Sequence, residues 1–259
     1  MTDFIPFSNL SPEDRAFVSR VRDMFRLVET KNVRRFSAFL DGRQQLLTQQ
    51  VAKADGYENY LLFGGLEQEN ERRILGIFPF YESAEIQEFP IQPLSFRYRV
   101  SDKLSHRDFL GSFMSLNLKR ETIGDILVGE GCAVVFVQPQ AAQIIQTEIV
   151  KIGRVGVTIE PAITVPVPKL YTLKPISGTV SSLRLDCIVA FTCNQSREKA
   201  QQLIRAGSVT LQYQICEDIA QQVQQNDIFS VRGYGKFRLE QVGAITKKGR
   251  LHIVCSRYI

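Results

Sequence analysis

The chain has 259 residues, of which 44% are hydrophobic, and a formal net charge of +5. This composition is typical of a globular protein with one to three domains, and no apolar run is long enough for a membrane span or a secretory signal. Five scattered cysteines and two histidines form no Cys-x-x-Cys or similar ligand pattern. We therefore expect a cytoplasmic protein without a zinc site, a cofactor or a disulfide framework.

The first 80 residues are predicted to form a mainly helical domain. Ser11-Pro12-Glu13-Asp14 combines a capping residue, a proline at the first turn and two acids at the positive end of the helix dipole, which predicts a helix over 11–31. A second helix is expected over 44–53, before Asp55-Gly56, and a strand over 72–79.

Residues 81–163 are predicted to form a second domain in which strands and helices alternate. Strands are expected at 94–100, 125–128, 132–138 and 155–160, and helices at 106–116 and 141–150. This β-α-β-β-α-β order predicts a ferredoxin-like or RNA-recognition-like sheet with both helices on one face. The strands lack the stacking aromatics of a true RNA-recognition motif, so contact with RNA or with protein both remain open. Prolines at 161, 166, 168 and 175 predict an extended linker over 164–180.

Residues 181–259 are predicted to form a C-terminal domain, which makes the whole chain an α+β protein. Two short helices are expected there, the second capped by Ser196 and ended by a left-handed Gly207. Strands should follow at 209–211 and 228–233, with a hairpin over 236–257. The apolar stripe of the helix pair consists of Leu185, Ile188, Val189, Ala200, Leu203 and Ile204.

The whole charge surplus lies in this C-terminal domain. Residues 181–259 hold 11 basic and 6 acidic side chains, whereas residues 1–180 hold 21 of each. Such a local surplus is typical of a polyanion-binding unit, although a scattered, solvated helix face would give a similar composition. The RNA contacts we predict are Arg184, Ser196, Arg197, Lys199, Gln202 and Arg205 on the helix pair, and Arg232, Lys236, Arg238, Lys247, Lys248 and Arg250 on a second basic edge.

Substitution of the helical arginines is expected to affect binding and not folding. Arg197 and Arg205 lie off the apolar stripe, and exposed substitutions usually change stability by no more than about 0.5 kcal/mol. The loop 232–238 mixes glycines, aromatics and basic residues, so it fits either stacking on unpaired bases or a simple β-turn with one buried tyrosine.

The order of residues in this region resembles a known RNA-binding module. Arg184-Leu185-Asp186, followed by Ser196-Arg197, Ala200, Leu203-Ile204, Gly207 and Val209, is similar to the S-four (αL) domain named after a small-subunit ribosomal protein. The resemblance implies a helical RNA-binding face. One departure is the pair Gln212-Tyr213, where the domain usually has Asn-Gly after its strand.

A second resemblance extends over nearly the whole chain. Residues 105–112 and 118–128, with Phe39-Leu40-Asp41, Tyr57, Gly64-Gly65 and Glu67, resemble the YlmH family of bacterial RNA-binding proteins, which carry an S-four domain at the C-terminus. The resemblance implies ribosome-linked RNA binding, in some members during rescue of stalled large subunits that carry peptidyl-tRNA. Photosynthetic organisms have members labelled as photosystem II S-four-domain proteins.

Catalytic alternatives find little support in the residues. His106-Arg107-Asp108 copies a kinase tripeptide, but no Asp-Phe-Gly follows it. Pseudouridine synthases and methyltransferases also append S-four domains, yet the catalytic motif of the former and the glycine-rich nucleotide loop of the latter are missing. We therefore expect a non-catalytic, monomeric protein that binds structured RNA, ribosomal RNA and possibly tRNA, on a ribosomal subunit, without membrane insertion. The alternatives are an enzyme that modifies ribosomal RNA and a photosystem II assembly or expression factor.

Overall fold

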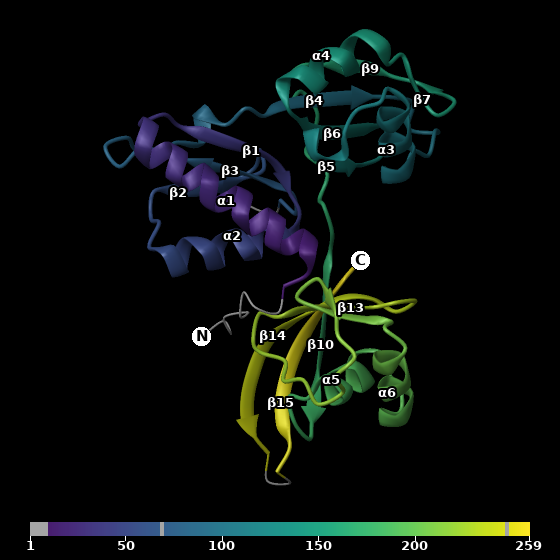
Figure 1. The fold of residues 1–259 in the computed structure, drawn as a ribbon. Coiled ribbons are helices and arrows are strands. Elements are labelled where there is room, and N and C mark those ends of the chain that lie inside the picture. Colours follow the sequence, from purple (N-terminus) through teal and green to yellow (C-terminus); the bar gives the residue numbers. More distant parts are fainter. Residues whose placement is uncertain (1–9, 68–69, 247–248) are drawn as a thin grey trace. The chain divides into compact units, whose positions relative to one another are not determined.

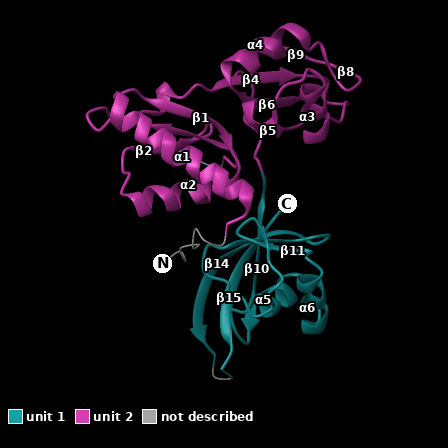
Figure 2. Cartoon of the chain, in the orientation of Figure 1, with its two compact units in different colours: residues 1–2, 171–259 teal, residues 3–170 magenta. Residues whose placement is uncertain are grey.

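The computed structural model describes residues 10–67, 70–246 and 249–259, and the chain divides into two compact units that separate between Leu170 and Tyr171 (Figures 1 and 2). The first unit in chain order, labelled unit 2 in Figure 2, contains the predicted N-terminal and middle segments, which we call the first and second lobes. The C-terminal domain, labelled unit 1 in Figure 2, is called the C-terminal unit below. Each unit has its own hydrophobic core.

The first lobe packs two helices on a three-stranded antiparallel sheet. Helices α1 (Pro12–Lys31) and α2 (Gly42–Asp55) confirm the two predicted ones, and Ser11 Oγ accepts the Asp14 N–H at 3.1 Å as the expected cap. The sheet has the order β1-β3-β2, with β1 at Arg35–Leu40, β3 at Arg73–Ile77 and β2 at Tyr60–Phe63. Only β3 was predicted, so the segment is less purely helical than the sequence indicates. Strand β1 is covered on both faces, which removes the polar–apolar alternation that would have revealed it.

The second lobe has the predicted ferredoxin-like order. Its sheet runs β5-β6-β4-β9, and every neighbouring pair is antiparallel. The strands and helices of this lobe are β4 (Gln92–Arg97), α3 (His106–Ser115), β5 (Ile123–Val128), β6 (Cys132–Val137), α4 (Pro139–Glu148), β7 (Lys151–Ile152), β8 (Val155–Gly156) and β9 (Thr158–Glu160), with 3₁₀ turns η2 (Ile86–Glu88) and η3 (Arg120–Thr122). Phe109 and Phe113 of α3 and Ile145 of α4 share one core with Phe96 and Val135, which places both helices on one face of the sheet.

The opposite face of this sheet packs against the first lobe. Val134 and Phe136 of β6 share a second core with Phe39 of β1 and Ile74 of β3. Gly65, at φ 109°, lies so close to the Phe136 ring that a Cβ atom would overlap it. An RNA-recognition sheet uses this face to stack bases. Here the chain itself covers it, so this face is not open to RNA.

A buried carboxylate joins the two lobes at one end of that contact. Asp125 of β5, which is 4% exposed, accepts hydrogen bonds from Asn70 Nδ2 at 3.1 Å and from the Glu71 and Arg72 N–H groups at 2.8 and 3.1 Å. The Arg72 guanidinium also donates to the Phe39 and Ile123 carbonyls. Burial raises the pKa of Asp125, although its three hydrogen bonds act in the opposite direction.

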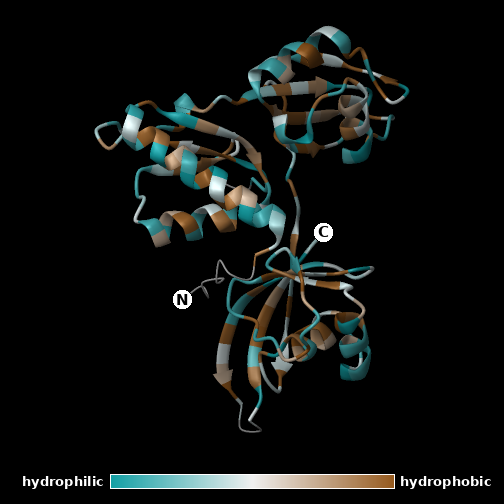
Figure 3. Cartoon of the chain, viewed as in Figure 1, coloured by the Kyte–Doolittle hydropathy of each residue, from teal (hydrophilic) through white to brown (hydrophobic). Residues whose placement is uncertain are grey.

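The C-terminal unit is a six-stranded antiparallel sheet covered by two helices, in the order β10-β15-β14-β13-β11-β12. Its elements are β10 (Leu173–Val180), α5 (Leu185–Thr192), α6 (Arg197–Arg205), β11 (Val209–Leu211), β12 (Gln214–Ile215), β13 (Ile228–Val231), β14 (Gly235–Ile245) and β15 (Leu251–Tyr258). The predicted helix pair, strands and hairpin are all present. Figure 3 shows that α6 is largely hydrophilic, as expected of a helix that buries only a narrow stripe.

The predicted linker over 164–180 requires a correction. Residues 173–180 form β10, which pairs with β15 from Leu173↔Tyr258 to Val180↔Leu251. Pro175 suggested an irregular segment, but β10 is an edge strand, where a missing N–H is tolerated. Val165, also within the predicted linker, is buried against the first unit. The C-terminal unit therefore begins about ten residues earlier than predicted.

Candidate RNA-binding surface

The α5–α6 pair forms because each helix buries one narrow side. Leu185, Ile188 and Val189 of α5 pack into the core together with Ala200 and Ile204 of α6. Ser196 Oγ accepts the Lys199 N–H at 3.1 Å and caps α6, and Gly207 adopts φ 64° just after it. The remaining sides of α6 face solvent, so its first turn presents free backbone N–H groups and exposed side chains.

A buried carboxylate organises the polar side of this helix pair. Asp186 has no exposed side-chain surface and accepts four hydrogen bonds. Arg184 donates to both carboxylate oxygens at 3.1 and 3.2 Å, Arg197 Nε donates at 2.9 Å, and Gln201 Nε2 donates at 2.9 Å. Burial by itself would raise the pKa of Asp186, but the hydrogen bonds from Arg184, Gln201 and Arg197 outweigh it and hold that pKa well below its ordinary value.

This arrangement changes the expectation for Arg197. Its side chain is 52% exposed, as predicted, but its guanidinium also neutralises Asp186 and ties α6 to α5. We therefore replace the expectation that its substitution would leave folding unchanged by the prediction that it also lowers stability. Helical spacing shows that Arg197 lies off the apolar stripe. It does not show that Asp186, eleven residues earlier, is buried and accepts a hydrogen bond from Arg197, because that contact depends on how α6 packs on α5. Arg184 is likewise both partly exposed, at 32%, and paired with Asp186.

The other predicted residues at the start of α6 and along it are exposed to solvent. Ser196, Lys199, Gln202 and Arg205 are all exposed. Lys199 and Arg205 form no ion pair with any residue that the structure describes. Their charges are therefore available to a polyanion without the loss of an internal contact.

A groove beside α5 brings a distant arginine to this surface. The groove has a volume of about 310 Å³ and is lined by residues 179–181 at the end of β10, by residues of α5 and by Arg197 and Arg250. Arg250 donates to the Thr179 hydroxyl at 3.0 Å and to the Thr179 carbonyl at 2.7 Å, which holds it there. Arg250 was predicted on a separate basic edge. No sequence pattern connects it with Arg197, because the two meet only through the pairing of β10 with β15.

The rest of the predicted second edge does not form one continuous surface. Phe237 and Leu239 of β14 point into the core, so Lys236 and Arg238 lie on the opposite sheet face from α5 and α6. Lys236 Nζ lies 4.8 Å from the Tyr258 ring centre and 5.8 Å from that of Tyr213. Arg238 pairs with Glu240 at 2.8 Å.

Three further predicted contacts have different placements. The exposed Arg232 begins the β13–β14 turn, where its N–H donates to the Ser208 carbonyl at 2.9 Å, close to the end of α6. Lys247 and Lys248 lie outside the described residues.

The one departure from the S-four pattern leaves the turn intact. Gln212 and Tyr213 have φ values of 48° and 67°, and they connect β11 to β12 in a two-residue hairpin with Leu211 opposite Gln214. Two left-handed residues are what a type I′ turn requires, and Asn-Gly is the usual solution. A hydrogen bond from the Gln212 side chain to the buried Asp227 supports the less favourable residues here.

The residues that suggested catalysis have structural positions. His106 is the first residue of α3, and Asp108 accepts from the Ser105 N–H at 2.8 Å as part of a capping box. Among the residues that the structure describes, no three His, Cys, Asp or Glu side chains gather as metal ligands would. No helix within residues 10–67, 70–246 and 249–259 is long and apolar enough to cross a membrane.

Comparison with known proteins identifies two modules in the places described above. Residues 85–164 match the model of a putative RNA-binding domain in YlmH, and residues 183–229 match that of the S4 domain. The cell division protein ylmH from Streptococcus pneumoniae has a similar fold, with a TM-score of 0.51 at 24% identity over 60% of this chain and 93% of that one. The ribosome-associated protein quality control protein P2 of Bacillus subtilis (strain 168) is 30% identical over 264 residues, which cover 97% of this chain and 98% of the relative. Because the likeness extends over both chains nearly from end to end, this protein belongs to the YlmH family of RNA-binding-domain proteins.

Proposed function

We propose that this protein is a non-catalytic RNA-binding protein that docks on ribosomal RNA through its C-terminal unit. The observation that carries the proposal is the α5–α6 surface, where the exposed Lys199 and Arg205, which form no ion pair with a described residue, lie on the helix whose start is capped by Ser196. The same unit holds the whole basic surplus of the chain.

The chemistry of this surface suits a phosphate backbone. Arg197 and Arg250 both line the groove of about 310 Å³, and in this proposal their guanidinium groups hold a phosphate there. The free N–H groups at the start of α6 add partial positive charge beside Arg197. Lys199 and Arg205 then contact neighbouring phosphates, and Gln202 and Ser196 supply uncharged hydrogen-bond donors. Such contacts fix the orientation of the protein on structured RNA.

The ribosomal partner is inferred from the relative. The Bacillus subtilis protein is described as ribosome-associated, and the likeness covers both domains that the family models match. We extend this association to the present chain, with ribosomal RNA of the large subunit as the ligand and tRNA as a possible second contact. In the second lobe, the sheet face that carries no helices is covered by the first lobe. We therefore assign the main RNA contact to the C-terminal unit.

Binding to purified large subunits tests this assignment. A fragment of residues 171–259, which includes β10, should retain most of the affinity of the full chain, and log K should fall steeply with log salt. Affinity that is insensitive to salt, or that resides in residues 1–170, would contradict the proposal.

The rival function is modification of ribosomal RNA. The protein incubated with ribosomal RNA, with and without S-adenosylmethionine, should produce no new methyl group or pseudouridine detectable by mass spectrometry. One site-specific modification that depends on this protein would favour the enzyme instead.

A further inference from the structure

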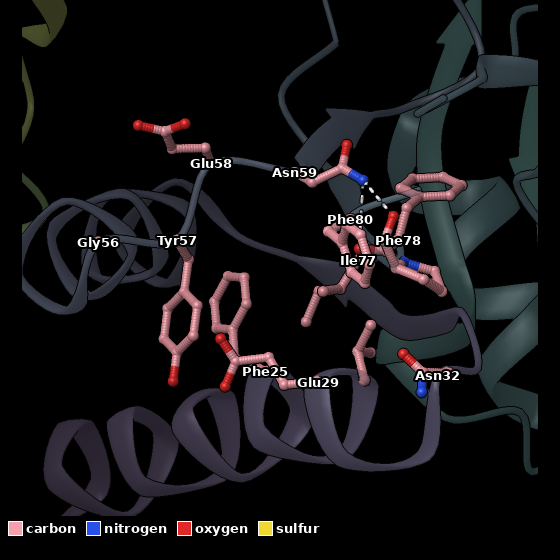
Figure 4. A pocket seen from close by; sticks show the side chains of 12 residues that line it. Phe25, Glu29, Asn32, Gly56, Tyr57, Glu58, Asn59, Ile77, Phe78 and Phe80 are labelled. Atoms are coloured by element: carbon pink, nitrogen blue, oxygen red, sulfur yellow. Dashed lines mark hydrogen bonds between the residues drawn. The ribbon is translucent and has the colours of Figure 1, made fainter. Parts of the chain in front are cut away.

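The first lobe contains a cavity that the RNA surface does not use. It has a volume of about 440 Å³ and opens between the ends of α1 and α2 and the end of β3 (Figure 4). Phe25, Val28 and Ile77 are among the apolar side chains that line it. The Tyr57 ring stacks on Phe25 with 4.0 Å between ring centres and 3° between planes, which forms an aromatic wall. We call this cavity the aromatic pocket.

The rim of the aromatic pocket is acidic. Glu29 and Glu58 line it, both are exposed, and neither forms an ion pair with a described residue. Figure 4 shows the Glu29 carboxylate beside the stacked rings of Phe25 and Tyr57. The pKa of Tyr57 is raised, mainly because the side chain is partly buried and also because of the negative charges of Glu29 and Asp55. Among the residues that the structure describes, no lysine or arginine lines the pocket.

Two helix ends add to this negative potential. Asn32 caps the C-terminus of α1 and Gly56 caps that of α2, and both residues line the pocket. The C-terminal end of a helix carries partial negative charge. The nearby cations lie outside the lining: Arg22 is paired with Asp55 at 2.7 Å, and Arg26 and Lys31 are exposed. The charges of Arg26 and Arg22 offset part of the effect of the acids on the pKa of Tyr57.

An ordered, exposed phenylalanine stands at the mouth. Phe80 is 89% exposed and lies in the turn that follows β3. That turn is held by Asn59, whose Nδ2 donates to the carbonyls of Phe78, Pro79 and Glu82 at 3.3, 2.6 and 3.0 Å. Phe80 is therefore presented to solvent by a braced backbone. An apolar ring held in this way beside a cavity indicates a contact surface for a ligand.

We propose that the aromatic pocket binds an arginine or lysine side chain of a partner protein, with an adjacent apolar residue of that partner packed on Phe80. The cation would lie against the rings of Tyr57 and Phe25 and be neutralised by Glu29 and Glu58. RNA does not suit this site, because its phosphates would meet two unpaired carboxylates and two negative helix ends. The site belongs to the first unit and its occupant is a protein, so it is independent of the proposed RNA contact.

The test uses the full chain with labelled isoleucine and valine methyl groups, observed by NMR. The probes are two blocked pentapeptides, Gly-Leu-Arg-Leu-Gly and the matched Gly-Leu-Glu-Leu-Gly. The arginine peptide should shift the Val28 and Ile77 methyl signals saturably, and the glutamate peptide should not. Absence of a saturable shift at these methyls, or an equal shift with the glutamate peptide, overturns the proposal.

Two variants and one control separate this site from general charge effects. The double variant Glu29→Gln/Glu58→Gln should bind the arginine peptide roughly fivefold more weakly, since exposed ion pairs contribute modestly. Phe80→Ala should weaken binding with the fold unchanged, because its ring is exposed. The control Glu130→Gln/Glu148→Gln, at exposed positions outside the pocket, should bind as the natural protein does. All of these variants should keep full affinity for ribosomal RNA, and a loss in the pocket variants alone would make the pocket an RNA contact and refute the proposal.

Discussion

Replacement of Lys199 and Arg205 by glutamine should weaken RNA binding and leave the fold intact. Each phosphate neutralised on a duplex contributes about 0.9 to the slope of log K against log salt, which is about 0.9 log units of affinity at 0.1 M salt. Two lost contacts therefore predict a loss of about sixtyfold, or about 2.4 kcal/mol. Both side chains are exposed and have no ion pair in the described chain, so the free energy of unfolding should change by less than about 0.5 kcal/mol.

Arg197→Gln should behave differently at the same surface. It removes a phosphate contact and also the hydrogen bond at 2.9 Å to the buried Asp186. Loss of a hydrogen bond to a charged group costs about 1.5–3 kcal/mol, and the 52% exposure of Arg197 reduces this to about 1–2 kcal/mol of unfolding free energy. Arg197→Gln should therefore lose both affinity and stability, whereas the Lys199/Arg205 pair loses affinity alone.

Fluorescence anisotropy with large-subunit ribosomal RNA between 50 and 200 mM salt measures the first effect, and urea unfolding measures the second. The salt slope of the double variant should be about 1.8 smaller in magnitude than that of the natural protein. The matched control is Arg15→Gln/Lys53→Gln, which removes two exposed charges from the other unit. If the control pair weakens binding as much as the Lys199/Arg205 pair, or if the slope of the latter does not change, the α5–α6 surface is not the RNA contact.

Three further results are expected. The pKa of Asp186 is depressed in the folded protein, so its stabilising contribution is complete above the unfolded pKa of about 4 and is lost as pH falls through the folded value. In urea unfolding between pH 6 and pH 2, the free energy of unfolding of Asp186→Asn should therefore fall less steeply with decreasing pH than that of the natural protein. Equal slopes for the two proteins would argue against this role. Gly65→Ala should destabilise residues 1–170 by more than about 2 kcal/mol, because the new methyl group overlaps Phe136 and the backbone is left-handed. Calorimetry of residues 1–170 alone should show one transition, shifted as a whole; two transitions within this fragment, with only one of them shifted, would show that the two lobes do not share a core. Residues 181–259 should melt well below residues 171–259, because β15 loses one of its two partner strands and the core loses Val180. Equal melting temperatures would show that β10 contributes nothing to the unit.

The sequence by itself determined the elements that depend on neighbours along the chain. Ser11 and Pro12 start α1, Ser196 starts α6, and Gly207 ends the turn after it, because capping and left-handed backbone involve only a few consecutive residues. The alternation of strands and helices in the second lobe was readable for the same reason. The basic surplus of residues 181–259 pointed to the domain that carries the candidate site.

The tertiary structure alone decided which charges are available and which faces are open. Asp186 is only two residues from Arg184, so that pair is local. The packing of α5 on α6 buries Asp186 and brings Arg197 to it as a second partner. Arg250 reaches the groove of Arg197 because β10 pairs with β15, and β10 itself was hidden by a proline that an edge strand tolerates. The second-lobe sheet has one face closed by β1 and β3, and of these two strands only β3 was predicted, because burial on both sides of β1 left no alternation to detect. Contacts between segments far apart in the chain fix burial, and burial determines whether a charged side chain stabilises the fold or remains free for a ligand.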